Sequence, residues 1–371
     1  MATDNEIPVD VIIDILLRLP VVSLIRARVV CKNWYTIIKN PSFVTNHFNH
    51  HTNNSGRLFV HRLDIISHKF IFSLFPDETL AGSPLVYEDM VVDMPHYLGI
   101  SLYNGILCLS NHFRSNHFAL WNPATREFRS LPMPSHKFPH EETFGFGLDP
   151  ITNDYKVIWI WKTLDDVTNV RYGPYQVAVY TLSTDSWRYL DFPMPYSDID
   201  TPPSNTCING VYHWFAIHND HRRRVILSFD MGNELVHEIR DIPSSKPAVL
   251  APYNNNNSLA LMCRDYDSSV VDIWVMIEEG CWTKQFTVQL LSKHKLPLGF
   301  WKNGQLFMGS DDDDTNLALY DLETHEIKHL GSLFLFNVLV YKESLVTIRG
   351  RDGFLEQDQL SDVDKVLNFS K

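Results

Sequence analysis

The stretch FALWNPATREFRSLP, residues 118–132, shows the pattern that decides the fold of most of this 371-residue chain. An apolar run ending in an aromatic residue is followed by the polar turn residues Asn122 to Thr125, and then by a second run that ends at a proline. Runs rich in β-branched and aromatic residues, bounded by Gly, Pro, Asn and Asp, are typical of β-strands joined by tight turns. The stretch therefore predicts an antiparallel strand pair.

The same pattern occurs six times along the chain. Its marks are aromatic residues at intervals of 49, 59, 49, 45 and 46 residues: Phe72, Trp121, Tyr180, Phe229, Trp274 and Tyr320. Three units are preceded by a further strand pair broken by the dipeptide typical of type I′ hairpins, at Asn104-Gly105, Asn209-Gly210 and Asn303-Gly304. Four strands per unit, at a period of roughly 40 to 50 residues, indicate the blades of a β-propeller.

The two ends of the repeat region are incomplete in complementary ways. The first unit lacks a well-marked preceding pair, whereas FNVLVYKESLVTI, residues 336–348, has the pattern of two strands without a following pair. We therefore expect the C-terminal strands to complete the first blade, because a closed ring hides the edges of its sheets. The prediction is a six-bladed propeller, with a β-sandwich and a five-bladed ring as alternatives.

A different, helical pattern precedes the strands. Apolar residues follow the spacing of one helix face in the segment before Pro20, at Val9, Ile12, Ile13, Leu16 and Leu17. Pro20 should end this helix, Ser23 is placed to cap a second, and a third should end before Asn40-Pro41. Other faces are apolar too, so this piece has more apolar surface than its small core can use. It is either a helical cap on the body or a module stabilised by a partner.

The helical piece resembles the F-box over forty residues without a gap. The matching residues are Pro8, Asp10, Ile15-Leu16, Arg18-Leu19-Pro20, Ser23-Leu24, Arg26, Val30-Cys31-Lys32, Trp34, Ile38, Pro41, Phe43 and His47; Ile7-Pro8 replaces the usual Leu-Pro. The family inserts apolar helix surfaces and a Leu-Pro corner into a Skp-type adaptor. That adaptor is carried by a cullin, which brings a RING subunit and the ubiquitin-conjugating machinery.

The resemblance implies an adaptor-binding surface on this helical piece. Carried over residue by residue, it consists of Pro8, Ile15, Leu16, Leu19, Pro20, Leu24, Val30, Cys31 and Trp34. Some of these must instead serve the core of the three helices, and Trp34 is the most obvious of them. Buried apolar and aromatic anchors would carry the affinity for the adaptor.

The strand-rich body resembles the plant F-box-associated domain, often called kelch-like. The segments that carry the resemblance are WNPATREFRSLP, FGFGLDPITNDYKVI, VYTLSTDSWR, NGVYHWFA, ILSFDMGNE and PLGFWKNGQLF. Within that family the chain is similar to the S-locus F-box proteins of pollen, whose relatives recognise pistil ribonucleases. The expected organisation is α+β and multidomain: a three-helix F-box at 5–48, an all-β propeller at 57–350 and a polar tail at 351–371.

The resemblance implies a substrate-recognition subunit of a Skp-cullin-F-box E3 ubiquitin ligase, with no catalytic residue of its own. Its protein substrate, marked for ubiquitination and proteasomal degradation, is not identified by the sequence. The net charge of the chain is −12, and residues 1–50 carry four acids and five bases, so the remaining residues carry a net charge of −13. This negative charge would attract a basic partner such as a ribonuclease. The alternative is a kelch-like scaffold that binds the adaptor without ubiquitin transfer.

The sequence argues against cofactor, metal and nucleic-acid sites. GFGLDP, residues 145–150, lacks the third glycine of a nucleotide-binding loop, and His47, His50 and His51 have no nearby cysteine or carboxylate to complete a metal site. The four adjacent acids Asp311 to Asp314 lack the ligand spacing of a calcium loop. An acidic body repels nucleic acid. The basic run Arg222 to Arg224 is a candidate partner-binding loop.

Compartment follows from the termini and the cysteines. The chain starts MATDNEIPVD, without a signal-peptide pattern, and no stretch of about 18 apolar residues indicates a membrane span. Five scattered cysteines without a C-x-x-C pair fit a reducing compartment, the cytoplasm or the nucleus.

Overall fold

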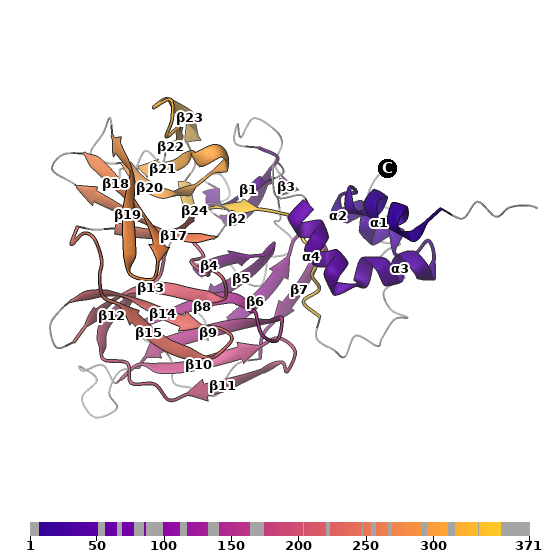
Figure 1. Ribbon diagram of the computed structural model, residues 1–371, viewed down its shortest axis with the longest axis horizontal. Coiled ribbons are helices and arrows are strands. Elements are labelled where there is room, and N and C mark those ends of the chain that lie inside the picture. The colour runs from indigo at the N-terminus through magenta and orange to yellow at the C-terminus, as the bar shows by residue number, and fades with distance from the viewer. Residues whose placement is uncertain are drawn as a thin grey trace, which may run out of the picture.

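The computed structural model describes residues 7–50, 56–64, 69–77, 85–86, 99–111, 117–132, 141–163, 174–202, 204–219, 223–246, 248–253, 257–265, 269–290, 295–310, 316–332 and 334–349. Four helices come first, and a ring of β-sheets follows them (Figure 1). The helices are α1 (Val9–Leu17), α2 (Val21–Ala27), α3 (Lys32–Lys39) and α4 (Pro41–His50). They lie together beside the ring, next to β7 and one end of β24 (Figure 1).

Six antiparallel four-stranded sheets, the blades, make up the ring. Blade 1 combines β24 (Phe334–Tyr341) with β1 (Arg57–Asp64), β2 (Lys69–Phe75) and β3 (Leu85–Val86). The other blades take their strands in chain order: blade 2 consists of β4 (Gly99–Tyr103), β5 (Ile106–Asn111), β6 (His117–Asn122) and β7 (Glu127–Ser130), and blade 3 consists of β8 (Glu141–Asp149), β9 (Asp154–Lys162), β10 (Gln176–Thr181) and β11 (Ser186–Leu190). Blade 4 consists of β12 (Tyr196–Asp200), β13 (Val211–His218), β14 (Arg224–Asp230) and β15 (Leu235–Ile239), and blade 5 consists of β16 (Ala248–Tyr253), β17 (Ser258–Asp265), β18 (Val270–Glu278) and β19 (Cys281–Gln289). Blade 6 consists of β20 (Lys295–Phe300), β21 (Leu306–Ser310), β22 (Asn316–Tyr320) and β23 (Ile327–Ser332).

The ring is closed by both strand pairing and packing. β24 pairs with β1 in antiparallel register, with Leu58 opposite Val340 and Val60 opposite Val338. Buried apolar clusters join each blade to the next, including one between blade 6 and blade 1. The six-bladed propeller is therefore confirmed, and the β-sandwich and five-bladed alternatives are wrong.

The C-terminal prediction needs one correction. Only one strand of residues 336–348, part of β24, joins blade 1. Residues 342–349 leave the sheet and run along blade 2, and we call them the strap. They form no strand because side chains, rather than a neighbouring strand, take up their backbone groups: Asn122 donates to the carbonyl oxygens of Ser344 and Val346, and Glu127 accepts from the amide of Ile348.

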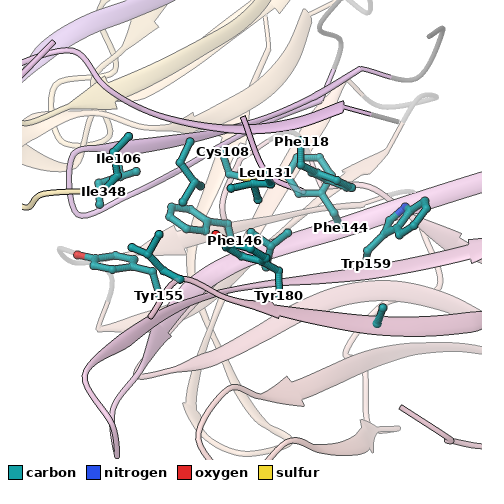
Figure 2. Close-up of a cluster of buried hydrophobic side chains, with 14 of the residues drawn as sticks. Ile106, Cys108, Phe118, Leu131, Phe144, Phe146, Tyr155, Trp159, Tyr180 and Ile348 are labelled. Atoms are coloured by element: carbon teal, nitrogen blue, oxygen red, sulfur yellow. The ribbon is translucent and has the colours of Figure 1, made fainter. Parts of the chain in front are cut away.

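Blade strands are apolar on both faces because each blade packs between two others. In β5, Leu107 and Leu109 face the cluster shared with blade 1, whereas Ile106 and Cys108 face the one shared with blade 3. Figure 2 shows this second cluster, in which the strap residue Ile348 is also buried. Strands buried on both faces have continuous apolar runs, which explains why the apolar residues of this sequence occur in short uninterrupted stretches.

The aromatic marks of the repeat all lie on the third strand of their blade, β2, β6, β10, β14, β18 and β22. Five of them are buried, but Trp274 is not. Trp274 is half-buried at the margin of the cluster that blades 4 and 5 share, and the neighbouring Ile273 is buried in the cluster that blades 5 and 6 share.

The turn after the third strand also repeats. The side chains of Asn122, Asp230 and Asp321 each accept hydrogen bonds from the backbone amides two and three residues ahead. The fourth residue after each has a positive φ: Arg126, Glu234 and His325. The Asn-Gly turns differ among themselves, since Asn104-Gly105 and Asn209-Gly210 have the positive φ pair of type I′, whereas Asn303-Gly304 ends the 3-10 turn η1 (Lys302–Gly304) with a positive φ at Gly304 alone.

The helical module has four helices, not the three expected. Pro41 is not a stop but the first residue of α4, where a missing N–H costs nothing, and the Asn40 side chain accepts a hydrogen bond from the Ser42 amide at 2.9 Å. Ser23 does not cap α2 either. Pro20 is the N-cap, and its carbonyl accepts from the amides of Ser23 and Leu24.

Candidate functional site

The helical module does not complete its core alone. Its buried residues are Leu16, Val21, Leu24, Ala27, Ile38 and Phe43, and the strap residue Leu345 is buried among them. Ala124, in the turn between β6 and β7, packs against the same cluster. The propeller therefore supplies part of the core that forty residues are too few to build.

Hydrogen bonds hold the strap that carries Leu345. Asn122 Nδ2 donates to the carbonyl oxygens of Ser344 at 3.0 Å and Val346 at 2.7 Å. The Glu127 carboxylate accepts from the Ile348 amide at 2.9 Å and the Thr347 hydroxyl at 3.1 Å. Module, strap and blade 2 are thus joined by apolar packing and by polar contacts.

The surface of the module is rich in exposed apolar side chains. Seven of the twelve exposed large apolar residues of the described ranges lie within residues 7–30: Ile7, Val9, Val11, Ile15, Val22, Val29 and Val30. The other five are spread singly over a propeller several times larger: Phe128, Ile151, Tyr189, Leu235 and Ile277. A concentration of this kind marks a protein-interaction surface.

The nine predicted adaptor contacts fall into two groups. Pro8, Pro20 and Cys31 are exposed, Ile15 is 49% and Val30 is 64% exposed, and Leu19 and Trp34 are half-buried against the module core. Leu16 and Leu24 are wholly buried, so they are core residues rather than contact residues.

The structure corrects the expectation about which residues form the core. Trp34, the residue most expected there, lies only at its margin. Val9, Val22 and Val29 are exposed residues that were not predicted as part of the contact surface. The available signal was the excess of apolar residues in the module.

His47 has a structural role in the module. It is buried in α4 rather than placed on a polar loop, its Nε2 lies 2.8 Å from the Leu19 carbonyl oxygen, and its ring stacks on Phe43. The contact fixes the Leu19-Pro20 corner between α1 and α2. Within the described ranges, no three His, Cys, Asp or Glu side chains are grouped as a metal site requires.

Two charged groups of the propeller also serve the fold. The Lys156 ammonium contacts Asp149 at 2.8 Å, Glu234 at 2.9 Å and the Met231 carbonyl at 2.7 Å, which ties blade 3 to blade 4. Burial alone would raise the pKa of Asp149, but hydrogen bonds from Lys156, Thr152 and the backbone lower it to about 2. These mutually satisfied charges are typical of a structural ion-pair network.

The predicted arginine loop is partly structural as well. Arg222 lies outside the described residues, as do Asp311 to Asp314. Arg224 stacks on the Phe215 ring at 3.7 Å and donates to two backbone carbonyl oxygens between blades 4 and 5, so it is not available to a partner.

A recess of about 2690 Å³ lies between the module and the propeller. On one side it is lined by α2, α3 and α4, on the other by the turns and strand ends of the propeller around its axis. Arg28 is half-buried at this junction, and burial lowers its pKa while the nearby Glu127 carboxylate opposes that effect.

Comparison with known proteins identifies the two parts. Residues 5–46 match the F-box domain and residues 88–367 match the F-box associated beta propeller domain. The chain belongs to the F-box proteins with an F-box associated propeller. Proteins with this domain pair are generally substrate adaptors rather than enzymes, and the F-box implies a Skp-type adaptor as partner.

Relatives of this F-box protein are found in Arabidopsis thaliana. F-box protein CPR1 is 26% identical over 87% of this chain and 84% of its own length, and F-box protein At3g07870 is 27% identical over 81% and 78%. Putative F-box/kelch-repeat protein At1g13200 is 24% identical over 78% and 73%. The narrower likeness to S-locus F-box proteins stays a prediction.

Proposed function

We propose that this F-box protein is the substrate receptor of a Skp-cullin-F-box ubiquitin ligase. The module binds a Skp-type adaptor, the adaptor links it to the cullin and RING subunits, and the propeller holds a protein substrate for ubiquitination and degradation. One observation carries the proposal: a module whose core is already completed within the chain, by Leu345, still exposes seven large apolar side chains.

The contact surface that we propose is centred on α1 and the corner that follows it. Val9, Val11 and Ile15 are exposed there, and Pro20 is exposed at the corner held by His47. Leu19 packs on the core from the same side. Burial of such anchors in a partner's groove gives most of the affinity of an interface.

The receptor would act by proximity. Holding a substrate beside a ubiquitin-charged enzyme raises the effective concentration of substrate lysines, and a fixed geometry makes the gain larger. The strap contributes such a fixed geometry, because it packs into the module through Leu345 and into blade 2 through Ile348. Cytoplasm or nucleus is the compartment that we propose for this activity.

The adaptor contact is tested with Val11→Asp/Ile15→Asp in the full chain. Both side chains are exposed, so the variant should keep the wild-type circular dichroism and unfolding midpoint. We expect pull-down of a purified Skp-type adaptor to fall at least about tenfold, since a charge is desolvated at a buried contact. The matched control is Ile151→Asp, which places a charge at an exposed apolar site of the propeller. Equal capture by both variants would show that α1 is not the contact.

Ubiquitin transfer separates this function from its alternative. The complex is reconstituted with adaptor, cullin and RING subunit, and partners captured by the propeller are examined for ubiquitin chains. Chains that disappear with Val11→Asp/Ile15→Asp support the receptor. A partner that is bound but never modified supports the scaffold that binds the adaptor without transfer.

A basic ribonuclease is a candidate substrate, supported by the net charge of −13 that remains for residues 51–371 once residues 1–50 are subtracted. Such binding should be strongest at low salt. A panel of basic pistil ribonucleases tests it in that condition, and no binding by any member would exclude this target.

A further inference from the structure

Positive charge is concentrated in the recess between module and propeller, although the chain as a whole carries −12. The module side contributes Arg26, Arg28, Lys32 and Lys39. The propeller side contributes Arg126, Lys302, Lys342 and Arg349. Among the lining residues that the structure describes, the acids are Glu127 and Asp154, which leaves an excess of six positive charges over this part of the recess.

The two acids are already occupied by the fold. Glu127 accepts hydrogen bonds from the strap and lies near Arg349 at 3.7 Å. Asp154 accepts from the backbone amides of Tyr155 and Ser183. Among the described residues, Arg349 is the only cation of the lining that forms an ion pair with one of these two carboxylates.

Lys342 makes this point most clearly. It is half-buried where the strap leaves β24, and no ion pair between described residues includes it. Burial lowers the pKa of the Lys342 ammonium. Arg28 differs in having the Glu127 carboxylate nearby, but its Nε is buried without a hydrogen-bond partner among the described residues. Half-buried cations of this kind are stabilised by an anion from outside.

The remaining lining suits a peptide. Asn153, Asn209 and Asn257 are exposed at the propeller side, and each carboxamide can donate to a peptide carbonyl and accept from a peptide amide. Tyr253 and Phe300 add an aromatic pair with ring centroids 5.0 Å apart. The volume of about 2690 Å³ also exceeds the roughly 300–1000 Å³ of a small-molecule pocket.

From these observations we infer that the recess binds an acidic peptide segment of the substrate protein, held between the F-box module and the propeller. The statement that the peptide belongs to a substrate rests on the proposed receptor function. The statement that the recess binds an acidic peptide does not. Cys31, Val22 and Val29 line the recess, whereas Val9, Val11 and Ile15 of the proposed adaptor surface on α1 do not, so an adaptor on α1 leaves most of the recess lining free. A basic partner would have to bind elsewhere on the propeller.

The direct test is fluorescence anisotropy with the full chain. The probe is a fluorescein-labelled twelve-residue peptide of alternating Glu and Ser, and the matched peptide has Gln in place of every Glu. We expect the Glu peptide to bind at least about tenfold more tightly, with an affinity that falls as salt rises. Equal binding of the two peptides, or no binding of the Glu peptide, would overturn the proposal.

Variants place the binding in the recess. Lys302→Gln/Lys342→Gln should weaken the Glu peptide about tenfold or more. Arg126→Gln/Arg349→Gln, a second pair in the lining, should do the same if the first variant is poorly folded. The control is Lys328→Gln, an exposed lysine of β23 outside the recess, which should leave the affinity unchanged. Weakening by the control alone would overturn the assignment.

Two further arms separate the causes of failure. Inositol hexakisphosphate tests a compact polyanion, and if it binds while the Glu peptide does not, the peptide assignment is wrong. Adaptor pull-down is run on the same variants. If peptide binding is lost while adaptor capture is intact, the two lysines take no part in adaptor binding, and the proposed receptor function is unaffected. If the chain binds the peptide but captures no adaptor, the recess is still a peptide-binding site and the proposed receptor function is wrong.

Discussion

The propeller blades and the helical module place their apolar side chains differently. In β5 of blade 2, residues 106–109 are buried because blades 1 and 3 cover both faces of the sheet. In the module, Leu345 and Ala124 cover one side, and Val29 and Val30 on the surface are 71% and 64% exposed. The difference teaches that the propeller is complete as a folded unit, whereas the module is complete in its core but not on its surface.

The largest effect should come from Leu345, the side chain from beyond the module that is buried in the module core. Leu345→Ala removes a buried leucine from the module core and should destabilise the module by about 2–5 kcal/mol, while the blades keep their packing. Urea unfolding of the full chain measures the loss of stability, and limited proteolysis within residues 7–50 shows whether the loss falls on the module. Leu235→Ala, at an exposed leucine of β15, is the control. A module equally resistant in both variants would show that Leu345 is dispensable.

The next effect separates the strap from an ordinary turn. Asn122→Ala removes the turn hydrogen bonds and both bonds to the strap, and should cost about 1–3 kcal/mol because buried carbonyl groups lose a donor. Asp321→Ala removes the same turn bonds in blade 6, where no strap is attached, and should cost about 0.5–1.5 kcal/mol. Chemical denaturation compares the two. Equal losses would mean that the strap bonds add nothing.

Acid should act first on the propeller. The described carboxyl groups with lowered pKa values lie there, including Asp149, Asp230 and Glu234. A lowered pKa in the folded state contributes stability above the unfolded value and loses it as pH falls through the folded value, here from about 4 to about 2 for Asp149. Thermal unfolding across this range should show the loss, and Asp149→Asn should flatten it. An unchanged slope in that variant would contradict the assignment.

The smallest effect concerns the exposed valines. Val29→Ser/Val30→Ser should change the free energy of unfolding by no more than about 0.5 kcal/mol, because neither side chain is buried. The same change at Val60, buried between blades 6 and 1, is the contrasting variant and should be severe. If both were severe, the module surface would be part of the fold rather than a docking surface.

Much of the fold was predictable because it repeats. A strand pattern that occurs six times averages out local ambiguity, and the aromatic marks located the third strand of every blade. What failed was local: Trp274 is only half-buried against its cluster, and Asn303-Gly304 took a 3-10 turn. A single sequence does not show how deeply one residue is covered by the neighbouring blade or which form one turn takes.

The module was harder to predict in detail. Its helical spacing identified α1 but could not separate Leu16, which is buried, from Ile15 beside it, which is exposed, because both are apolar. Nor could the sequence show that residue 345 lies in the core of residues 7–50, since no local pattern links positions three hundred residues apart. The recess was invisible for the same reason, because its cations come from segments scattered over the chain.

The strap has a consequence for the birth of the protein on the ribosome. The module emerges first, yet the leucine that completes its core and the strand that closes the ring are made some three hundred residues later. At roughly 5–20 residues per second, the nascent module waits for many seconds with an open core. Chaperones would meet it in that interval, and a chain cut short before residue 345 would present the adaptor with an unfinished module. The core of the module can therefore be completed only after residue 345 has been made.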